Sequence, residues 1–327
     1  MVIYKEISQL EKNNNTVLTL GTFDGVHLGH KKIMETLHLK SKTRGSRNLV
    51  ITFEPHPRTV LYKNSKRIEL LTSFKEKVAF FEELKVDNLL VLNFTESFSQ
   101  IPSDVFFKEF VIDKIGLSEI IVGHDHKFGK ARGGDETLLK ELGEMYNFDV
   151  TPVTGITLDD ITVSSTKIRN LLYEGDVKSA NRMLGRPFSF IAKVVEGDKR
   201  GRLLGFPTAN VVDVDANKLT PAIGVYSVEV FINSNKYPGV MNIGRRPTFD
   251  NNRDKVIKEV HIIDFEGTIY GEEITVNVID RIREEKRFAS KDELIKQISI
   301  DRSKSLEILS GFKDLTSSSI FENRNFN

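Results

Sequence analysis

Two histidines and three glycines lie close together between residues 21 and 30, directly after a short apolar run. The stretch reads Gly-Thr-Phe-Asp-Gly-Val-His-Leu-Gly-His, so His27 and His30 flank Gly29. Glycine lets the backbone approach a ligand closely, and the free N–H groups at the start of a helix favour phosphate. Imidazoles placed there could donate hydrogen bonds to phosphate oxygens as charge develops. The spacing predicts a phosphate site. A helix cap or a metal pair is the alternative, although no third ligand is nearby in the sequence.

A second set of phosphate-binding groups is predicted where Ser164, Ser165 and Thr166 precede a helical pattern. Their hydroxyls can cap the helix and, with its first N–H groups, bind phosphate. Arg169 follows Thr166 by three residues, about one helical turn, so both side chains can point the same way. A simple cap followed by a surface arginine is the plainer interpretation.

The strongest chemical signal in the second half is the stretch Gly201-Arg-Leu-Leu-Gly-Phe-Pro-Thr-Ala-Asn210. Thr208 and Asn210 are two residues apart, so on a strand they share one face. A hydroxyl and an amide oxygen are hard ligands that suit Mg²⁺ together with substrate phosphates. The alternative is a turn followed by a half-exposed strand without a metal.

Glu259 is a candidate general base on a later predicted strand, where His261 and Ile263 share its face. A carboxylate can accept the proton of an attacking hydroxyl, as it does in kinase catalytic loops. An exposed strand carboxylate with no catalytic role is the alternative.

The first half alternates strand-like and helix-like segments, which predicts βαβ units and a parallel sheet. The predicted strands are Val17–Leu20, Leu49–Phe53, Leu89–Leu92, Ile120–Val122 and Phe148–Val150. The predicted helices between them are Lys31–Lys42, Phe74–Leu84, Val105–Ile115 and Glu136–Met145. Ligands of such α/β sheets bind at the carboxyl ends of the strands, which is where the motifs above lie.

After Leu184 the pattern changes to many short strands with tight turns, which predicts a small antiparallel barrel. The predicted strands are Phe188–Val195, Gly224–Ile232, Lys236–Ile243, Val256–Asp264 and Glu273–Asp280. One long helical pattern, Lys291–Leu309, would close the barrel. We therefore expect an α/β domain at 1–184, a barrel domain at 185–315 and a polar tail at 316–327.

Composition limits the class of protein. The 327 residues favour two domains, and the formal net charge of +1 argues against a dedicated nucleic-acid binder. The absence of cysteine excludes disulfides, zinc–thiolate sites, iron–sulfur clusters and a cysteine nucleophile. No apolar run approaches the ~18 residues of a membrane span, and residues 1–10 lack the apolar stretch of a signal peptide. A soluble cytoplasmic protein is expected.

The stretch at 21–30 resembles the nucleotidyltransferase superfamily, and in its full length the FMN adenylyltransferase module of bacterial bifunctional riboflavin kinase/FAD synthetases. Three more stretches support the resemblance. They are Phe53–Arg58, Val122–Gly129 with Arg132–Asp135, and Ser164–Arg169. The resemblance implies a Rossmann-like nucleotidyltransferase fold that attacks the α-phosphate of ATP and expels pyrophosphate.

The second half resembles the riboflavin kinase module of the same family. The stretches that carry this resemblance, in order, are Gly205–Asn210, Gly224–Tyr226, Asn242–Phe249 and Glu259–Phe265. The resemblance covers residues 16 to 312. It implies that Thr208 and Asn210 hold the magnesium of Mg-ATP and that Glu259 is the base.

The family also implies the other site residues. In the first half, those expected at ATP are Gly21, Thr22, Phe23, Asp24, Gly29, Ser164, Ser165 and Thr166, with His27, His30 and Arg169 catalytic. Those expected near the flavin there are His56, Pro57, Arg58, Asp125 and Phe128; His126 stands where relatives often carry an aromatic residue. In the second half, ATP is expected at Gly201, Gly205, Thr208 and Asn210, and riboflavin at Arg287, Phe288 and Leu294. Simple closure of the barrel by the last helix is an alternative for that final segment.

The implied activity is phosphorylation of riboflavin to FMN by ATP, then adenylylation of FMN to FAD, with Mg²⁺ at both steps. The expected partners are riboflavin, FMN, ATP and flavin-accepting apoproteins, with no nucleic acid and no membrane. One rival is a monofunctional FMN adenylyltransferase, which predicts damage at Thr208, Asn210 or Glu259, yet all three are present. A non-catalytic flavin-binding regulator would add a DNA-binding element or lose the histidine pair. A cytidylyltransferase would explain only the first half.

Overall fold

The computed structural model divides the chain into two compact units, Met1–Ser165 and Thr166–Asn327. The residues that the structure describes are 1–62, 69–124, 127–130, 133–197, 205–233, 235–246 and 255–317. None of the helices in these ranges has the length and apolar character needed to cross a lipid bilayer.

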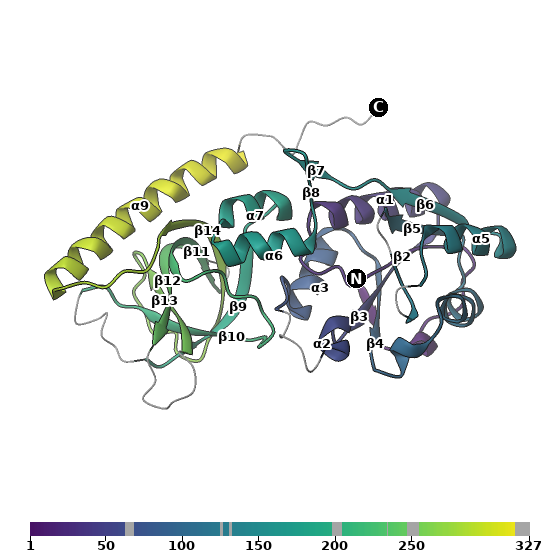
Figure 1. Cartoon of the computed structure of the whole chain (residues 1–327), viewed down its shortest axis with the longest axis horizontal. Helices are drawn as coiled ribbons and strands as arrows, with labels where there is room; N and C mark the ends of the chain where they lie inside the picture. The colour runs from purple at the N-terminus through teal and green to yellow at the C-terminus, as the bar shows by residue number, and fades with distance from the viewer. Residues whose placement is uncertain are drawn as a thin grey trace. The chain divides into compact units, whose positions relative to one another are not determined.

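The first unit contains a six-stranded sheet in which every neighbouring pair of strands is parallel (Figure 1). The strands are β1 (Val2–Tyr4), β2 (Thr16–Leu20), β3 (Arg47–Glu54), β4 (Asn88–Asn93), β5 (Glu119–Gly123) and β6 (Asp149–Val153). Their order is β1-β4-β3-β2-β5-β6, which confirms the predicted parallel α/β fold. The sequence pattern missed β1, because three residues are too short to show a period.

Helices cover both faces of this sheet. They are α1 (Leu28–Arg44), α2 (Pro57–Leu61), α3 (Phe74–Glu83), α4 (Ser103–Val105), the π-helix η3 (Phe106–Ile115) and α5 (Glu136–Tyr146). Two 3₁₀ turns, η1 (Ile7–Gln9) and η2 (Phe98–Gln100), and the small hairpin β7 (Thr157–Leu158) and β8 (Ile161–Thr162) complete the unit.

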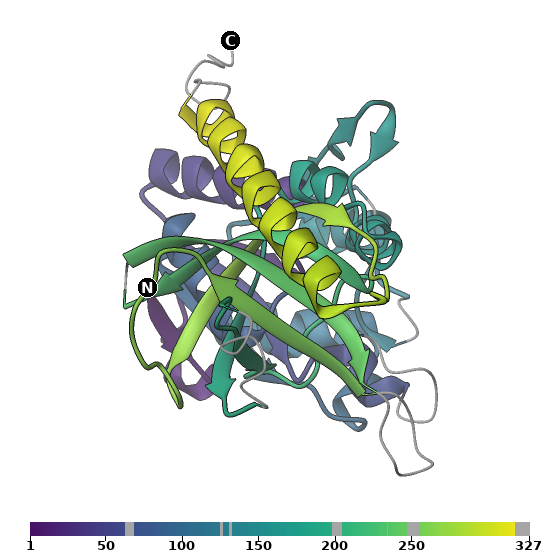
Figure 2. The same cartoon turned by 90° about the vertical axis from the view of Figure 1, so that its left-hand side faces the viewer.

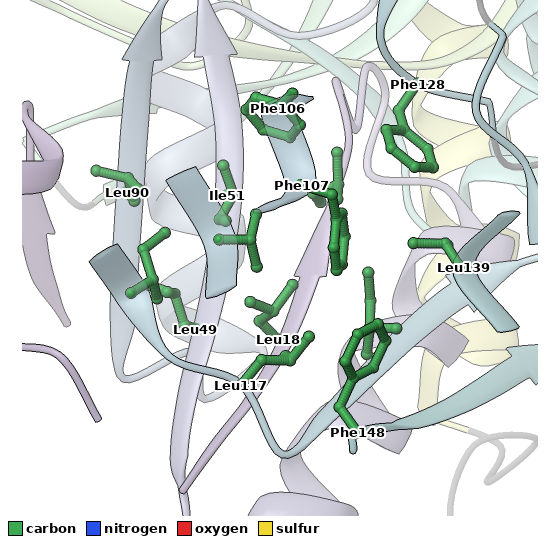
Figure 3. Close-up of a cluster of buried hydrophobic side chains, with 14 of the residues drawn as sticks. Leu18, Leu49, Ile51, Leu90, Phe106, Phe107, Leu117, Phe128, Leu139 and Phe148 are labelled. Atoms are coloured by element: carbon green, nitrogen blue, oxygen red, sulfur yellow. The ribbon is translucent and has the colours of Figure 1, made fainter. Parts of the chain in front are cut away.

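Every residue of β2 is buried, because successive side chains enter two different core clusters. Leu18 packs on one side with Phe107 and Phe148, as Figure 3 shows. Val17 packs on the other side with residues of α1 and α3 such as Met34 and Phe81. A strand buried on both faces reads as a continuous apolar run, which is why the sequence located it well.

The second unit contains a closed barrel of six strands, each antiparallel to its neighbours. The strands are β9 (Phe188–Val195), β10 (Ala209–Asp213), β11 (Gly224–Ile232), β12 (Asn235–Arg246), β13 (Lys255–Ile262) and β14 (Glu273–Arg283). Their order around the barrel is β10-β13-β12-β11-β14-β9. The predicted antiparallel barrel is confirmed.

The last helix, α9 (Lys291–Ser317), lies across the barrel strands, as Figure 2 shows. The Ser305 hydroxyl donates to the carbonyl of Gly239 at 2.8 Å, and Asp301 accepts from the guanidinium of Arg283 at 2.7 Å. The helix continues past the predicted end at Leu309 to Ser317 and so includes Gly311 and the first two residues of the predicted tail, 316 and 317. Residues 318–327 of the predicted tail lie outside the described residues.

Two helices, α6 (Ser165–Glu174) and α7 (Val177–Leu184), precede the barrel. The Asn181 amide donates to the carbonyls of Val278 (2.9 Å) and Ile279 (3.2 Å), and its oxygen accepts from the N–H of Phe188 at 2.6 Å. These bonds tie α7 to β14 and β9, within the second unit. The domain boundary after residue 184 stays a prediction.

Candidate active sites

The loop after β2 lies at the carboxyl edge of the parallel sheet. From β2 the strand order runs to β3, β4 and β1 on one side and to β5 and β6 on the other. The crevice beside such a reversal point is where doubly wound sheets bind ligands. Gly21–His27 leads directly from β2 into α1, so the predicted phosphate motif lies beside this reversal point of the sheet.

The two histidines of this loop stack on each other. Their ring centroids are 3.6 Å apart with an interplanar angle of 19°. His27 is the N-cap residue of α1, and His30 lies in the first turn. An alanine at Gly29 would bring its Cβ within 3.3 Å of the His27 ring, so the glycine allows the close approach. The structure brings His27, His30 and Gly29 together as predicted.

Burial lowers the pKa of His30 well below its usual value of 6.5. Repulsion from His27 and from the Lys77 ammonium lowers it further. His30 is therefore neutral at pH 7 and carries one N–H that can donate to an anionic ligand. Within the described part of the chain, its Nδ1 is buried and has no hydrogen-bond partner.

Lys77 is a buried cation near this pair, and no pattern in the sequence points to it. Lys77 lies in the first half of α3 and is 3% exposed. Burial lowers its pKa, while the charges of Asp24 and Glu54 act in the opposite direction. A buried amine is invisible in sequence because its helix reads as an ordinary charged surface helix.

The Asp24 carboxylate holds the loop in place. It accepts from the N–H groups of Leu71 (3.2 Å) and Thr72 (3.1 Å), and the Thr72 hydroxyl in turn accepts from Gly25 N–H at 3.0 Å. Phe23 and Val26 both have positive φ, 48° and 39°, a conformation that needs such support. An ATP contact of Asp24 stays a prediction, as it does for Gly21, Thr22 and Phe23.

The serine-rich motif meets the same loop through one hydrogen bond. The Ser165 hydroxyl donates to the backbone carbonyl of Asp24 at 2.8 Å. Ser164 directly precedes α6, where a phosphate-binding cap was predicted. Thr166 and Arg169 belong to the second unit, and Arg169 is 7% exposed. Their roles at the phosphates stay predictions.

The predicted flavin residues of the first unit fall in two places. His56 caps α2, its Nδ1 accepting from the N–H of Arg58 at 3.2 Å, and Pro57 is the first residue of that helix. Phe128 is buried in the core against Phe107, with ring centroids 5.8 Å apart (Figure 3). Asp125 and His126 lie outside the described residues. Flavin contacts of the other four stay predictions.

In the barrel, Glu259 has an asparagine directly opposite it on each neighbouring strand. Asn210 of β10 pairs with Glu259 of β13, and Glu259 pairs with Asn242 of β12. Residues opposite each other on antiparallel strands share a face, with Cβ atoms about 5 Å apart. The structure thus places the predicted site residues Asn210 and Glu259 side by side. It also places Asn242 next to Glu259, a residue of the motif 242–249 that was not predicted as a site residue.

The three paired residues Asn210, Glu259 and Asn242 form a polar row across the strands. The neighbouring Lys258 shows on which face of β13 this row lies. It is 5% exposed, and its ammonium lies 2.6 Å from the Asp213 carboxylate and 4.3 Å from the centre of the Phe190 ring. Val260, on the same face, is fully buried. Because side chains alternate along a strand, Glu259 points to the outer face of the barrel wall, where it is half-buried.

Two glycines leave room for this polar row. An alanine Cβ at Gly197 would overlap the side-chain amide of Asn210. An alanine at Gly244 would bring its Cβ within 3.1 Å of the Asn242 amide nitrogen and 2.5 Å of the Glu285 carboxylate. The segment after β14 therefore lies beside the row that contains Glu259.

The predicted riboflavin residues belong to that segment and to the start of α9. Phe288 is half-buried, with Lys286 5.2 Å and Arg283 5.8 Å from its ring centre. Arg287 is exposed and Leu294 is half-buried in the first turns of α9. Flavin contacts of Arg287, Phe288 and Leu294 stay predictions.

The predicted metal ligands lie at the start of β10. Thr208 directly precedes this strand, Asn210 is its second residue, and Gly205 before them has a φ of +83°. Gly201 lies outside the described residues. No group of three or more His, Asp or Glu is arranged to hold a metal ion within the described ranges.

Two family models match the two units in order. Residues 9–167 match the model described as FAD synthetase, and residues 184–309 match the model described as riboflavin kinase. Together they account for most of the chain, and the histidine pair and the Glu259 row fall in different matches.

Curated relatives match almost end to end and share the name bifunctional riboflavin kinase/FMN adenylyltransferase. The protein of Buchnera aphidicola subsp. Schizaphis graminum is 38% identical over 92% of this chain and 96% of its own length. That of Escherichia coli is 37% identical, covering 87% and 90%, and that of Bacillus subtilis is 35% identical, covering 93% and 95%.

A solved structure from Streptococcus pneumoniae has the same fold over 93% of this chain and 98% of its own length. The TM-score is 0.83 and the identity 30%; its title names a macrolide-efflux protein. Two family models and full-length relatives agree on a different name. This chain belongs to the family of bifunctional riboflavin kinases/FMN adenylyltransferases.

Proposed function

We propose that this chain phosphorylates riboflavin to FMN at the barrel and adenylylates FMN to FAD at the parallel sheet, with one ATP consumed at each step. The observation that carries the proposal is the pairing of Asn210 with Glu259 in one unit and of His27 with His30 in the other. Each unit therefore has its own polar cluster, which supports a separate nucleotide site in each.

At the barrel, Glu259 accepts the proton of the ribityl 5′-hydroxyl as that oxygen attacks the γ-phosphorus of ATP. The bond from the γ-phosphorus to the bridging oxygen breaks, and ADP leaves with the electron pair. A general base of this kind contributes about 100-fold or more to the rate. The half-buried position of Glu259 on the outer face of the wall leaves it accessible to substrate.

Thr208 and Asn210 would hold Mg²⁺ through a hydroxyl and an amide oxygen, with ATP phosphates as the remaining ligands. The donor set fits this ion, because Mg²⁺ prefers oxygen ligands and commonly binds through substrate phosphates. When bound, the cation offsets the phosphate charge during transfer. The absence of a side chain at Gly197 lets the Asn210 amide occupy its observed position.

At the sheet, a phosphate oxygen of FMN attacks the α-phosphorus of a second ATP, and pyrophosphate leaves. The neutral His30 and its partner His27 donate hydrogen bonds to the phosphate oxygens. The positive end of α1 supports the same charge. Ser165 and Asp24 hold the loop that carries the pair.

The flavin segments follow the same division. His56, Pro57, Arg58, Asp125 and Phe128 would border FMN, while Arg287, Phe288 and Leu294 would border riboflavin. Ser164, Thr166 and Arg169 would hold the triphosphate at the adenylylation step. Apoproteins that accept FMN or FAD in the cytoplasm would receive the products.

A product assay tests this function. Purified protein is incubated with ATP, Mg²⁺ and either riboflavin or FMN, and flavins are resolved by chromatography over time. With riboflavin, FMN should appear first and FAD after it. Formation of FAD only from added FMN would leave the monofunctional adenylyltransferase, and formation of neither product would overturn the proposal.

A further inference from the structure

His261 follows Glu259 by two residues on β13, so both side chains lie on the outer face of the barrel wall. Its Nδ1 atom lies 2.9 Å from the backbone carbonyl oxygen of Pro207, across 54 residues of sequence. A carbonyl oxygen can only accept a hydrogen bond, so Nδ1 must carry the proton. The contact therefore selects one tautomer of the imidazole.

The same imidazole also contacts the residue before Pro207. The ring of Phe206 meets it edge-on, with centroids 5.5 Å apart and an interplanar angle of 81°. Proline has no backbone N–H, so Pro207 cannot donate a backbone hydrogen bond that would fix its position. Within the described part of the chain, the hydrogen bonds and ring contacts of Gly205–Thr208 all come from His261.

Thr208 directly follows the carbonyl that His261 holds, and β10 begins one residue later. The place of the Thr208 hydroxyl relative to Asn210 therefore depends on where the Pro207 peptide sits. β13 carries the group that fixes this peptide and also carries Glu259, which pairs with Asn210. Strand β13 thus carries the proposed base and also fixes the peptide that precedes the proposed metal ligand Thr208.

We propose that His261 is a positioning residue of the kinase site: its Nδ1–H holds the Pro207 carbonyl and so places Thr208 beside Asn210 to receive Mg-ATP. This inference rests on the proposed kinase function. A positioning group behind a metal ligand acts mainly on metal and nucleotide affinity and less on the chemical step.

Three substitutions in the full chain separate this role from simple packing. His261→Ala removes the donor, and His261→Asn keeps an amide N–H near the position of Nδ1. His261→Gln places its amide near Nε2 instead, too far along the side chain to hold the same carbonyl. We expect His261→Ala to raise the KM for Mg-ATP about tenfold or more, with kcat changed less. His261→Asn should recover most of the affinity and His261→Gln little of it.

The control variant is His38→Ala, a histidine of α1 in the other unit, which should leave kinase kinetics unchanged. Conversion of added FMN to FAD should be the same in all His261 variants, which shows that the first unit is intact. Far-UV circular dichroism and thermal unfolding of each variant, compared with wild type, show that the barrel is folded. The imidazole nitrogen resonances of His261 can be assigned as those that disappear in the NMR spectrum of His261→Gln. In the wild-type protein they should show that the proton is on Nδ1.

Different outcomes would overturn the positioning role of His261 and the proposed kinase function. Wild-type protein without kinase activity would overturn both. An active wild-type enzyme whose His261→Ala variant keeps the wild-type KM for Mg-ATP would overturn only the positioning role, as would a proton found on Nε2. Equal loss in the Asn and Gln variants would also overturn it, because the role requires a donor at the Nδ1 position.

Discussion

Asn210 and Glu259 lie directly opposite each other on antiparallel strands, although 49 residues separate them in the chain. Because such partners share a face, the amide proposed to hold the metal and the carboxylate proposed to accept the proton lie next to each other. The register also places Asn242 on the far side of Glu259. The two groups act on different parts of one step, so their variants should differ in kinetics.

Glu259→Gln should lower the turnover of riboflavin by about 100-fold or more, because it keeps the shape but removes the base. The KM for ATP should change little. Kinase kinetics against ATP check this, with FMN adenylylation as internal control. Wild-type kinase turnover in this variant would remove Glu259 from the mechanism.

Asn210→Ala should instead weaken the use of Mg-ATP, because it removes an amide ligand and leaves the base in place. We expect a higher Mg²⁺ requirement, partly restored by excess Mg²⁺. A Mg²⁺ titration of kinase activity measures this. An unchanged Mg²⁺ dependence would exclude Asn210 as a ligand.

Gly197→Ala should impair the kinase without touching the adenylyltransferase, because the new methyl group would overlap the Asn210 amide. The matched control is Gly311→Ala within α9, where a Cβ meets nothing within 4 Å. The control should keep full kinase activity and stabilise the chain by about 0.5–1 kcal/mol. Equal kinase activity in the two variants would show that Asn210 can move without consequence.

His30 should make the first unit less stable in acid. Its pKa is below 6.5 in the folded state and near that value in the unfolded chain. As the pH falls below 6.5, the unfolded chain takes up a proton that the folded chain refuses, so stability is lost by up to about 1.4 kcal/mol per pH unit. Hydrogen exchange in β2 at pH 7.5 and 5.5, corrected for intrinsic rates, should show this loss in wild type and less of it in His30→Gln. The same loss in both proteins would contradict the assignment.

A barrel fragment that begins at Thr166 should be more stable than one that begins at Gly185. The longer fragment keeps the three Asn181 hydrogen bonds to the barrel strands and the bond from Ala222 N–H to the Leu172 carbonyl at 2.9 Å. Thermal unfolding of both fragments measures the difference. Equal melting temperatures would support a domain boundary after residue 184.

The sequence located most strands of both units because buried strands read as apolar runs between turns, as β11 does. The predicted strands did not include β1 or β10. The sequence also placed the histidine pair, because the motif and the elements around it are local. It did not find Lys77, Thr72 or Asn242, whose positions follow from packing and strand register. The hydrogen bond from His261 to Pro207 is likewise a property of the closed barrel, and no local pattern encodes it.

The most direct test of two sites in one chain mixes two defective variants. Glu259→Gln alone should convert FMN to FAD at the wild-type rate but phosphorylate riboflavin about 100-fold or more slowly, and His27→Ala alone should accumulate FMN because its adenylylation step is slowed by a similar factor. An equal mixture of the two, supplied with riboflavin, ATP and Mg²⁺, should form FAD at a rate near that of wild type. A mixture that forms no more FAD than either variant alone would contradict the account of two independent sites.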